Sequence, residues 1–315
     1  MLRVAVQMDP IEGIDIAGDS TFALMMSAQA RGASLFHYSP GDLTWRDGSL
    51  FAHAPAVEVR SVVGNHFTSG EPRTIDLSAD IDVVLMRQDP PFDIAYITAT
   101  HLLERIQPAT LVVNDPVAVR NAPEKLWVLD FARFMPPTLI TRSLDEVRAF
   151  HAKHGEIIVK PLHGNGGSGV FRIGRDGSNL GALTELFSEV WREPFMVQAF
   201  LPDVSAGDKR IVLVDGEVAG AINRIPGSGE IRSNLAAGGR AEATDLTSRE
   251  REICAALGPE LKARGLIFVG IDVIAGHLTE INVTSPTGIV AMDRFNGTDT
   301  PALIWDAIEA RVQAR

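Results

Sequence analysis

The chain has 315 residues, of which 45% are hydrophobic and 22% are charged, and its formal net charge at pH 7 is −11. This length and composition predict a globular protein of two or three compact units. The negative charge argues against a general nucleic-acid binder, which needs a basic face to neutralise phosphates. The single cysteine, Cys254, excludes an internal disulfide and a cysteine-based metal site, and we expect its side chain to be buried in a helix.

Strand and helix signals alternate through the first third of the chain. Residues 2–7, 33–38, 81–87 and 110–114 are apolar runs typical of strands, whereas residues 20–31 and 94–105 have helical patterns. This alternation predicts a parallel, doubly wound α/β sheet that ends near residue 122, after the breaker Asp115-Pro116. Because the first strand is short and no apolar run reaches the length of a membrane span, we expect a cytoplasmic protein that does not contact membranes.

Two loops of this region are candidates for ligand binding. Asp9-Pro10 follows the first predicted strand and residues 87–93 follow the third. Ligands of such sheets collect at the carboxyl ends of the strands. Turn formation driven by proline is the alternative explanation for both loops.

A glycine-rich loop at residues 161–170 separates predicted strands at residues 156–160 and 170–173. Its glycines, at positions 164, 166, 167 and 169, free backbone N–H groups to surround an anion. The spacing matches neither a Walker A loop nor a Rossmann fingerprint, so a surface hairpin is the alternative. Lys160 ends the first of these strands, where its charge can meet phosphate oxygens. Lys125 starts a predicted helix, and a solvated lysine is the alternative for both positions.

Further strands are predicted at residues 138–141, 195–201 and 207–214, and a helix at residues 144–154. Residues 195–201 suit either an adenine-binding wall or the core. The strand period of two places Asp208 and Arg210 on one face. Residues 223–240 form a long irregular segment with arginines at positions 224, 232 and 240. Loops of this length are usually functional or disordered, and the repeated guanidinium groups favour a functional loop.

Residues 270–282 predict a β-hairpin that carries a metal site. Glu280 and Asn282 point the same way on one strand. Asp272 lies beside Glu280 if the connecting loop has three or five residues, whereas a two-residue turn places Thr279 opposite Asp272. Two carboxylates and an amide oxygen, without His or Cys, suit Mg²⁺ or Mn²⁺ shared with the phosphates of a nucleotide. A solvent-facing acidic hairpin is the alternative. The last helix, residues 302–312, is amphipathic, and we expect it to pack on the C-terminal sheet.

Several motifs occur in a fixed order along the chain. They are NAPEKL at residues 121–126, IVKPL at 158–162, GNGGSG at 164–169, GDKR at 207–210, NLAAGGR at 234–240 and LTEINVTSPT at 278–287, preceded by VQMDPI at 6–11 and MRQDPPFD at 86–93. Together they resemble the prokaryotic glutathione synthetases, a family of the ATP-grasp superfamily. The resemblance runs through nearly the whole chain.

The resemblance implies an α/β protein with an ATP-grasp fold. It implies an N-terminal Rossmann-like, parallel-sheet domain at residues 1–122 that binds substrate, a central lid domain at residues 123–202 and a catalytic domain at residues 203–315. The implied ATP contacts are Lys125, Lys160, Gly164, Gly166, Gly167, Gln198, Phe200, Leu201 and Asp208. The implied Mg²⁺ ligands are Asp272, Glu280 and Asn282. Arg210 and Arg240 are implied to stabilise an acyl phosphate, and Arg87, Arg232, Asn234 and Ser285 to bind the peptide substrate.

The activity that the resemblance implies is the ATP-dependent ligation of γ-glutamylcysteine and glycine to glutathione. The loops at residues 164–169 and 226–240 are then expected to close as lids that exclude water. The family also implies a homo-oligomer, a tetramer. This chain departs from the family pattern at residues 288–293, where relatives tend to carry an Arg-Glu pair, and at Pro123, where Asn is more usual. Another carboxylate-amine ligase and a non-catalytic ATP-binding module similar to synapsin are the alternative functions.

Overall fold

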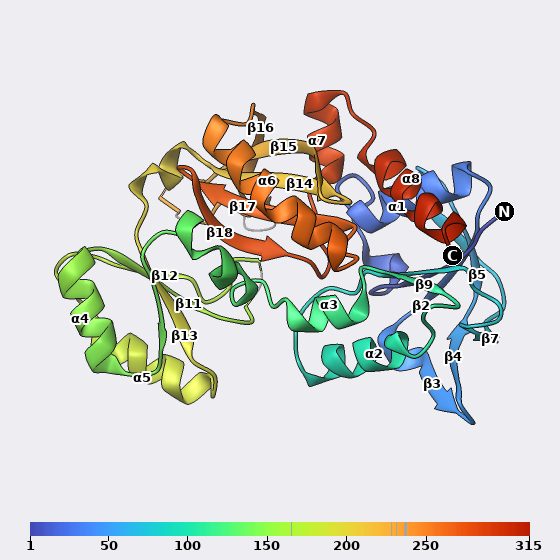
Figure 1. The fold of residues 1–315 in the computed structure, drawn as a ribbon, viewed down its shortest axis with the longest axis horizontal. Helices are drawn as coiled ribbons and strands as arrows, with labels where there is room; N and C mark the ends of the chain where they lie inside the picture. Colours follow the sequence, from blue (N-terminus) through green and yellow to red (C-terminus); the bar gives the residue numbers. More distant parts are fainter. Residues whose placement is uncertain (165, 228, 231, 236–237) are drawn as a thin grey trace.

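The computed structural model describes residues 1–164, 166–227, 229–230, 232–235 and 238–315. In this part of the chain, a six-stranded and a three-stranded sheet lie in the N-terminal region, a four-stranded sheet in the middle and a five-stranded sheet near the C-terminus. Figure 1 shows the four-stranded sheet at one end of the molecule, the five-stranded sheet in the middle and the six-stranded sheet at the other end. No helix among the described residues is long and apolar enough to cross a membrane.

The six-stranded sheet confirms the parallel arrangement predicted from the alternating pattern. Its order is β6 (Phe67–Ser69), β5 (Ala56–Val59), β2 (Ser34–Tyr38), β1 (Arg3–Gln7), β8 (Val83–Met86) and β9 (Leu111–Val113). β1 runs parallel to both β2 and β8, and β8 runs parallel to β9, whereas β5 and β6 add antiparallel strands at one edge. The helices α1 (Ser20–Ala30) and α2 (Ile94–Glu104) lie where they were predicted.

The region between residues 39 and 80 holds strands that sequence patterns did not predict. β3 (Leu43–Arg46), β4 (Ser49–Ala54) and β7 (Arg73–Asp76) form the small antiparallel sheet. Short 3₁₀ turns occur at η1 (Ile11–Gly13) and η2 (Pro40–Asp42). The predicted breaker at Asp115-Pro116 is instead the start of α3 (Pro116–Asn121), because the Asp115 carboxylate accepts a hydrogen bond of 2.8 Å from the Ala118 N–H and caps the helix.

The middle of the chain forms an antiparallel sheet with two helices. Its order is β10 (Thr138–Thr141), β13 (Phe195–Ala199), β11 (Ile157–Pro161) and β12 (Phe171–Ile173), with α4 (Leu144–His154) and α5 (Leu180–Val190) beside it (Figure 1). The predicted α-helix from about residue 124 is wrong: residues 124–126 form a turn, and the segment that follows is the 3₁₀ helix η3 (Trp127–Phe134).

The C-terminal sheet is antiparallel throughout. Its order is β16 (Arg240–Ala243), β15 (Glu217–Ile225), β14 (Asp208–Val214), β17 (Phe268–Ile274) and β18 (His277–Asn282). η4 (Pro202–Ala206) precedes it, and α6 (Ser248–Ala263) and α7 (Ile289–Asn296) accompany it. Cys254 lies on α6 and is buried, as predicted.

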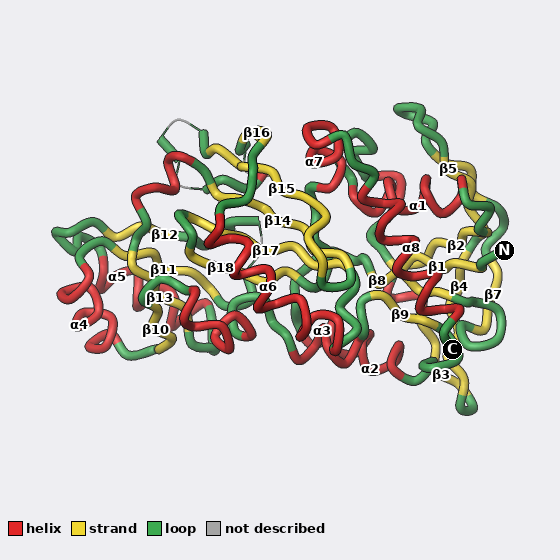
Figure 2. The backbone as a smooth tube through the Cα atoms, turned by 45° about the horizontal axis from the view of Figure 1, so that its top comes forward, coloured by secondary structure: helices red, strands yellow, loops and turns green. Residues whose placement is uncertain are grey.

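The last helix, α8 (Thr300–Gln313), corrects one expectation. It packs mainly against α1 of the N-terminal region rather than on the C-terminal sheet alone. The Trp305 Nε1–H donates a hydrogen bond of 2.9 Å to the Leu24 carbonyl, and Arg31 on the N-terminal side forms ion pairs with Asp306 and Glu309. The two chain ends therefore lie near each other, as the two views of the backbone show (Figures 1 and 2).

A buried amide joins the N-terminal sheet to the C-terminal sheet. Asn114, just after β9, donates hydrogen bonds of 2.7 Å to the Phe268 carbonyl and 2.8 Å to the Val283 carbonyl, and its Oδ1 accepts one of 2.9 Å from the Phe268 N–H. These bonds satisfy backbone groups at one end of β17 and just beyond β18. They hold the end of β9 in the N-terminal sheet against the ends of β17 and β18 in the C-terminal sheet.

Candidate active site

A cavity of about 330 Å³ opens between the middle sheet, the C-terminal sheet and the loops at the edge of the N-terminal sheet. It is large enough for part of a nucleotide and a small substrate. Most of the residues singled out from the sequence line it: Lys125, Lys160, Gly164, Gly166, Gly167, Gln198, Phe200, Leu201, Asp208, Arg210, Arg232, Asn234, Asp272, Glu280, Asn282 and Ser285. Arg87 and Arg240 do not belong to its lining.

The β17–β18 hairpin brings two carboxylates together. Asp272 and Glu280 are directly opposite each other, as predicted, but the predicted loop length is wrong. Only Ala275 and Gly276 connect the strands, both with positive φ, as a two-residue hairpin turn requires. The register shifts by one residue between Val273 and Asp272, which leaves Thr279 as the extra residue of a bulge. The bulge, and not an odd-length loop, therefore places Glu280 beside Asp272.

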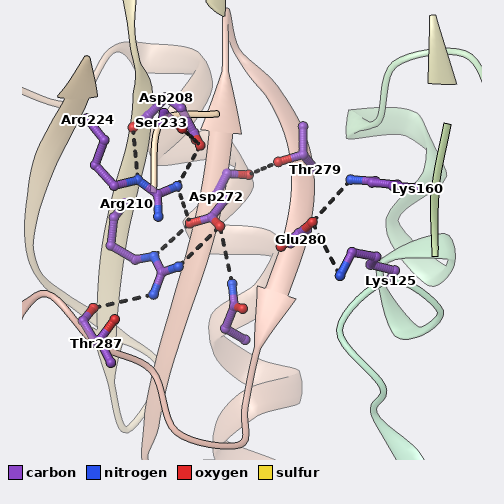
Figure 3. Close-up of polar contacts among 11 residues, drawn as sticks. Lys125, Lys160, Asp208, Arg210, Arg224, Ser233, Asp272, Thr279, Glu280 and Thr287 are labelled. Carbon is purple, nitrogen blue, oxygen red and sulfur yellow. Dashed lines mark hydrogen bonds and ion pairs between the residues drawn. The ribbon is translucent and has the colours of Figure 1, made fainter. Parts of the chain in front are cut away.

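A row of alternating charges crosses neighbouring strands on the same face of the C-terminal sheet (Figure 3). Asp208 on β14 lies opposite Arg224 on β15, and Arg210 on β14 lies opposite Asp272 on β17. Arg224 Nη2 lies 2.6 Å from Asp208 Oδ2 and 3.0 Å from Asp272 Oδ1, and Arg210 Nε lies 2.6 Å from the same Asp272 oxygen. Burial alone would raise the pKa of Asp272, but Arg210 and Arg224 hold it below its ordinary value.

Glycine at position 270 makes room for this row. Gly270 faces Asn282 across the hairpin, and a Cβ at Gly270 would lie 2.9 Å from Nη1 of Arg210. Any larger residue would therefore push the guanidinium group away from Asp272. The Arg210 Nη1–H group also donates a hydrogen bond of 3.3 Å to the Thr287 carbonyl, which orients the group toward the cavity wall.

Two buried lysines reach Glu280 from the other side of the cavity (Figure 3). Lys160 Nζ, on β11, lies 3.1 Å from Glu280 Oε1, and Lys125 Nζ lies 3.6 Å from the same oxygen. Lys125 also donates a hydrogen bond of 2.6 Å to the Gly164 carbonyl at the start of the glycine-rich loop. The lysine side chains are 5% and 7% exposed, which rules out a solvated-lysine role at both positions. Burial opposes the charge of Glu280, but the two lysines keep the pKa of Glu280 below its ordinary value.

Glu124 is a further acidic group of the cavity. Its Oε2 lies 3.9 Å from Lys125 Nζ, and its Oε1 accepts a hydrogen bond of 3.3 Å from the Thr284 hydroxyl. Burial raises the pKa of Glu124 to about 7, because Lys125 compensates the buried charge only in part and Glu280 repels it.

The predicted metal ligands offer only oxygen donors. Among the described residues, no group of three or more His, Cys, Asp and Glu side chains is arranged to hold a metal by itself. Asp272 and Glu280 contribute two carboxylates, and Asn282, whose Nδ2 lies 3.4 Å from Asp272 Oδ2, adds an amide. This partial set fits Mg²⁺, which is usually held by one or two carboxylates while phosphate oxygens and water complete its octahedron.

The strand that was predicted as a possible adenine wall does border the cavity. Gln198 on β13 is buried and donates a hydrogen bond of 3.1 Å to the Thr138 hydroxyl. Phe200 and Leu201 follow the strand, and the guanidinium of Arg172 lies 4.1 Å from the centre of the Phe200 ring. This edge combines apolar side chains with backbone groups, as planar heterocycles require.

The two loops expected to act as lids contact each other beside the cavity. A Cβ on Gly167, which has φ +79°, would lie 3.0 Å from Asn234 Oδ1 and 3.1 Å from Arg232 Cδ. Ser233, between those two residues, donates a hydrogen bond of 2.6 Å to Asp208 and so ties the second loop to β14. Asn165 of the first loop and Ser228, Ile231, Ala236 and Ala237 of the second lie outside the described residues.

Two of the predicted arginines lie away from the cavity. Arg240 starts the edge strand β16, its side chain is 72% exposed, and its Nη2 lies 2.6 Å from Glu242 Oε1. Arg87 is buried beneath the cavity wall, where its Nε–H donates to the Thr21 hydroxyl and its Nη2–H to the Pro286 carbonyl, at 3.0 and 2.9 Å. In this structure neither guanidinium group can touch a ligand in the cavity without local movement.

Sequence reasoning assigned no individual role to Arg224, Glu124 or Ser233, although all three line the cavity. The sequence predicts Arg224 in a loop, whereas β15 extends to Ile225 and places it on the sheet face that carries Asp208. The spacing of two residues between Ile222 and Arg224 is the sequence signal that would place both side chains on one face of a strand. Glu124 lies in the NAPEKL motif, next to Lys125.

Comparisons with known proteins add an independent observation. Residues 2–120 match the model of the N-terminal domain of prokaryotic glutathione synthetase, and residues 124–297 match the model of its ATP-grasp domain. A glutathione synthetase of Rhodopseudomonas palustris is 59% identical over 310 residues, which cover 98% of this chain and 99% of the relative. One of Yersinia pestis is 44% identical over 315 residues, covering 99% and 98%.

Solved structures with low sequence identity share the fold. The crystal structure of the D-cycloserine synthetase DcsG has a TM-score of 0.71 at 17% identity and covers 98% of this chain and 99% of that one. The ATP-grasp ligase PsnB, in a complex with its minimal precursor, Mg and ADP, has a TM-score of 0.62 at 19% identity, covering 99% and 98%. With the match to the ATP-grasp domain model, these similarities confirm the predicted fold.

Proposed function

Because the chain belongs to the family of prokaryotic glutathione synthetases, we propose that it joins γ-glutamylcysteine to glycine in a reaction driven by ATP. It is an ATP-dependent ligase. The assignment of residues rests on the charges that meet in one cavity. There Lys125, Lys160 and Arg210 surround the carboxylates of Asp272 and Glu280. Cations and oxygen ligands in this arrangement suit a polyphosphate, which brings negative charge and needs a divalent cation.

Lys125 and Lys160 bind the phosphates of ATP in this proposal. Both ammonium groups are buried and share Glu280. When phosphate oxygens arrive, they offer stronger anionic partners at the same place, so the lysines can turn from the carboxylate to the nucleotide. The adenine lies against Gln198, Phe200 and Leu201, and the glycine-rich loop from Gly164 through Gly166 and Gly167 covers the phosphates.

Asp272, Glu280 and Asn282 would hold Mg²⁺, with Mn²⁺ as a substitute of similar ligand preference. When bound, the cation supplies charge neutralisation for the phosphate oxygens. The turn of the lysines toward ATP frees Glu280 for this task. Asp208 lies at the end of the same charged row, and we assign it to the ribose side of ATP, since its Oδ1 is buried without a partner among the described residues.

Arg210 stabilises the acyl transfer. The C-terminal carboxylate of γ-glutamylcysteine attacks the γ-phosphorus, and an acyl phosphate and ADP form. The amine of glycine then attacks the carbonyl carbon, the C–O bond to phosphate breaks, and the amide and inorganic phosphate are released. Fixed guanidinium donors lower the energy of the oxyanion that develops in this step.

Arg224 replaces Arg240 in our assignment of the second guanidinium group. Arg224 lines the cavity and contacts Asp272, whereas Arg240 is exposed and paired with Glu242. Arg232, Asn234 and Ser285 are proposed to hold the peptide substrate. The contact between Gly167 and the loop that carries Arg232 and Asn234 supports a joint lid, which protects the acyl phosphate from water.

We propose three domains at residues 1–122, 123–202 and 203–315. The helix α8 of the third domain packs against α1 of the first. The tetrameric assembly implied by the family and the cytoplasmic location expected from the sequence stay predictions.

An isotope experiment tests the proposed chemistry. γ-Glutamylcysteine labelled with ¹⁸O in its C-terminal carboxylate is incubated with the enzyme, ATP, Mg²⁺ and glycine, and both products are analysed by mass spectrometry. We expect glutathione together with phosphate that carries one ¹⁸O atom. Unlabelled phosphate would contradict the acyl-phosphate route, and a product other than glutathione would contradict the substrate assignment.

A further inference from the structure

Three carboxylates converge at the carboxyl ends of β1 and β8, beside the cavity. Asp9 follows β1, Asp89 follows β8, and Asp19 caps the start of α1. The Asp89 N–H donates a hydrogen bond of 2.8 Å to Asp9 Oδ2, so these two loops lie against each other. Within the described ranges, none of the three carboxylates forms an ion pair. In the sheet, β1 lies between β2 and β8, and the three carboxylates lie at the carboxyl ends of β1 and β8. Ligands of such sheets usually bind at this edge.

Arg87 lies beneath these carboxylates and also has no ion-pair partner in the part of the chain that the structure describes. Its side chain is buried, and its Nη1 is a donor without an acceptor among the described residues. Burial lowers the pKa of Arg87, while the nearby charges of Asp19 and Asp89 act in the opposite direction. An unsatisfied buried donor of this kind costs about 1–3 kcal/mol, which a ligand that supplies an acceptor would recover.

The cluster opens toward the cavity already described. Asp89, Ser285 and Pro286 line that cavity, and the Ser285 hydroxyl donates a hydrogen bond of 3.1 Å to Asp89 Oδ1. Arg87 in turn donates to the carbonyl of Pro286. A substrate in the cavity therefore reaches the Asp89 carboxylate first, with Asp9 and the Arg87 guanidinium group behind it.

The charges determine which ligand fits. Three carboxylates and one guanidinium group repel a phosphate, so the nucleotide is excluded here. A metal ion fits poorly as well, because no group of three or more His, Cys, Asp and Glu side chains among the described residues is arranged to hold one, and the phosphate that could complete a smaller ligand set is repelled. The complementary ligand carries an ammonium group and a carboxylate on neighbouring atoms, as the free end of an amino acid does.

We propose that Asp9, Asp89 and Arg87 bind the α-amino acid end of the γ-glutamyl group, an inference that rests on the proposed function. A γ-linked glutamyl residue differs from an ordinary peptide residue because its α-ammonium and α-carboxylate are both free. The ammonium group binds Asp89 and Asp9, and the α-carboxylate supplies the acceptor that Arg87 Nη1 lacks. Because Nη1 is covered in this structure, the segment around Pro286 must shift when the substrate binds.

Substrate analogues test the subsite on the unaltered enzyme, so that no variant has to fold. Glutarylcysteine lacks the α-ammonium group, and 4-aminobutyrylcysteine lacks the α-carboxylate, while both keep the reacting C-terminal carboxylate. We expect kcat/KM for each to fall by about 10–100-fold relative to γ-glutamylcysteine, the range of one charge-assisted hydrogen bond. Analogues used within threefold of γ-glutamylcysteine would overturn the subsite.

A variant then assigns the ammonium contact to Asp89. Asp89→Asn should use γ-glutamylcysteine less well, and its preference over glutarylcysteine should shrink, because only Asp9 still faces the ammonium group. Its discrimination against 4-aminobutyrylcysteine should persist, because Arg87 is unchanged. Asp47→Asn is the matched control: it removes one exposed carboxylate of the same region at a positive-φ position that Asn tolerates, and it should keep the wild-type ratios.

The outcomes distinguish a failure of the proposed function from a failure of the proposed ammonium contact. If the wild-type enzyme forms no glutathione from γ-glutamylcysteine, the proposed function fails. If it forms glutathione but Asp89→Asn keeps the wild-type preference over glutarylcysteine, the proposed function stands and the ammonium contact is wrong.

Discussion

Asp272 and Glu280 lie directly opposite each other on neighbouring antiparallel strands, although only two residues connect those strands. A regular hairpin with this turn would pair Asp272 with Thr279. The bulge at Thr279 shifts the register by one residue, and the Thr279 hydroxyl donates a hydrogen bond of 3.1 Å to the Asp272 carbonyl. Bulges often re-aim side chains near active sites. Here the bulge places one carboxylate against arginines and the other against lysines.

Replacing Glu280 should affect turnover and stability together. Glu280→Gln removes a proposed Mg²⁺ ligand and leaves Lys125 and Lys160 without their shared anion. We expect kcat to fall at least about 100-fold and the free energy of unfolding to fall by roughly 1–3 kcal/mol, because buried charges lose their partner. ADP should restore part of the stability, since phosphate oxygens replace the carboxylate. Denaturant unfolding with and without ADP measures this.

Glu242→Gln is the control for that variant. It breaks an ion pair with an exposed arginine, so its effect on stability should stay within about 0.5 kcal/mol. If Glu280→Gln and Glu242→Gln lost equal amounts of stability, the contacts of Glu280 with Lys125 and Lys160 would not stabilise the fold.

The arginines should differ according to their position. Arg210→Lys and Arg224→Lys keep a charge but lose the forked contacts with Asp272, and we expect kcat to fall about 100-fold in each. Arg240→Ala should keep kcat within about threefold, because this side chain is exposed. Steady-state kinetics with all substrates saturating measures kcat for the three variants and checks this ranking. A large loss in Arg240→Ala alone would show that its loop brings Arg240 into the site during turnover.

Two neighbouring glycines separate backbone strain from loop contact. Gly166 and Gly167 both have positive φ, but a Cβ meets atoms within 4 Å only at Gly167. Each alanine variant strains the backbone by about 1 kcal/mol. Gly167→Ala also pushes against Arg232 and Asn234, so we expect its kcat/KM for ATP to be about tenfold below that of Gly166→Ala. Equal values in the two variants would remove the contact between the loops from the mechanism.

The raised pKa of Glu124 predicts a pH-dependent stability. The folded state holds this proton up to a pKa of about 7, above the ordinary value of 4.5, so the stability of the wild-type protein falls as pH rises between those values. Glu124→Gln has no such loss. Without nucleotide or metal, we expect the variant to gain about 3 kcal/mol over the wild type between pH 4.5 and pH 8. Urea unfolding measures the difference in stability between the variant and the wild type. A difference that does not change with pH would contradict the raised pKa of Glu124.

The sequence predicted those parts of the site that depend on strand periodicity. Asp208 with Arg210, and Glu280 with Asn282, each lie two apart on a strand, and the structure has each pair on one sheet face as predicted. The opposition of Asp272 and Glu280 was also predicted, but for the wrong reason, since local patterns do not reveal a bulge.

Other features depend on tertiary packing and were not predictable from local sequence. Lys125 is buried because Glu280 and the Gly164 carbonyl, distant in the sequence, surround it. The strands β3, β4 and β7 are short and half-exposed, so their apolar signal is weak. The amphipathic pattern of α8 shows that one face is buried but not against which partner, and its packing on α1 follows from the chain returning to its start.

The most direct test of the central claim is product formation with each component omitted in turn. The purified protein is incubated with ATP, Mg²⁺, γ-glutamylcysteine and glycine, while released phosphate is quantified and the peptide is identified by mass. We predict glutathione and phosphate in equal amounts, only when all four components are present. Phosphate release without glutathione, or ligation only with a different amine, would contradict the account.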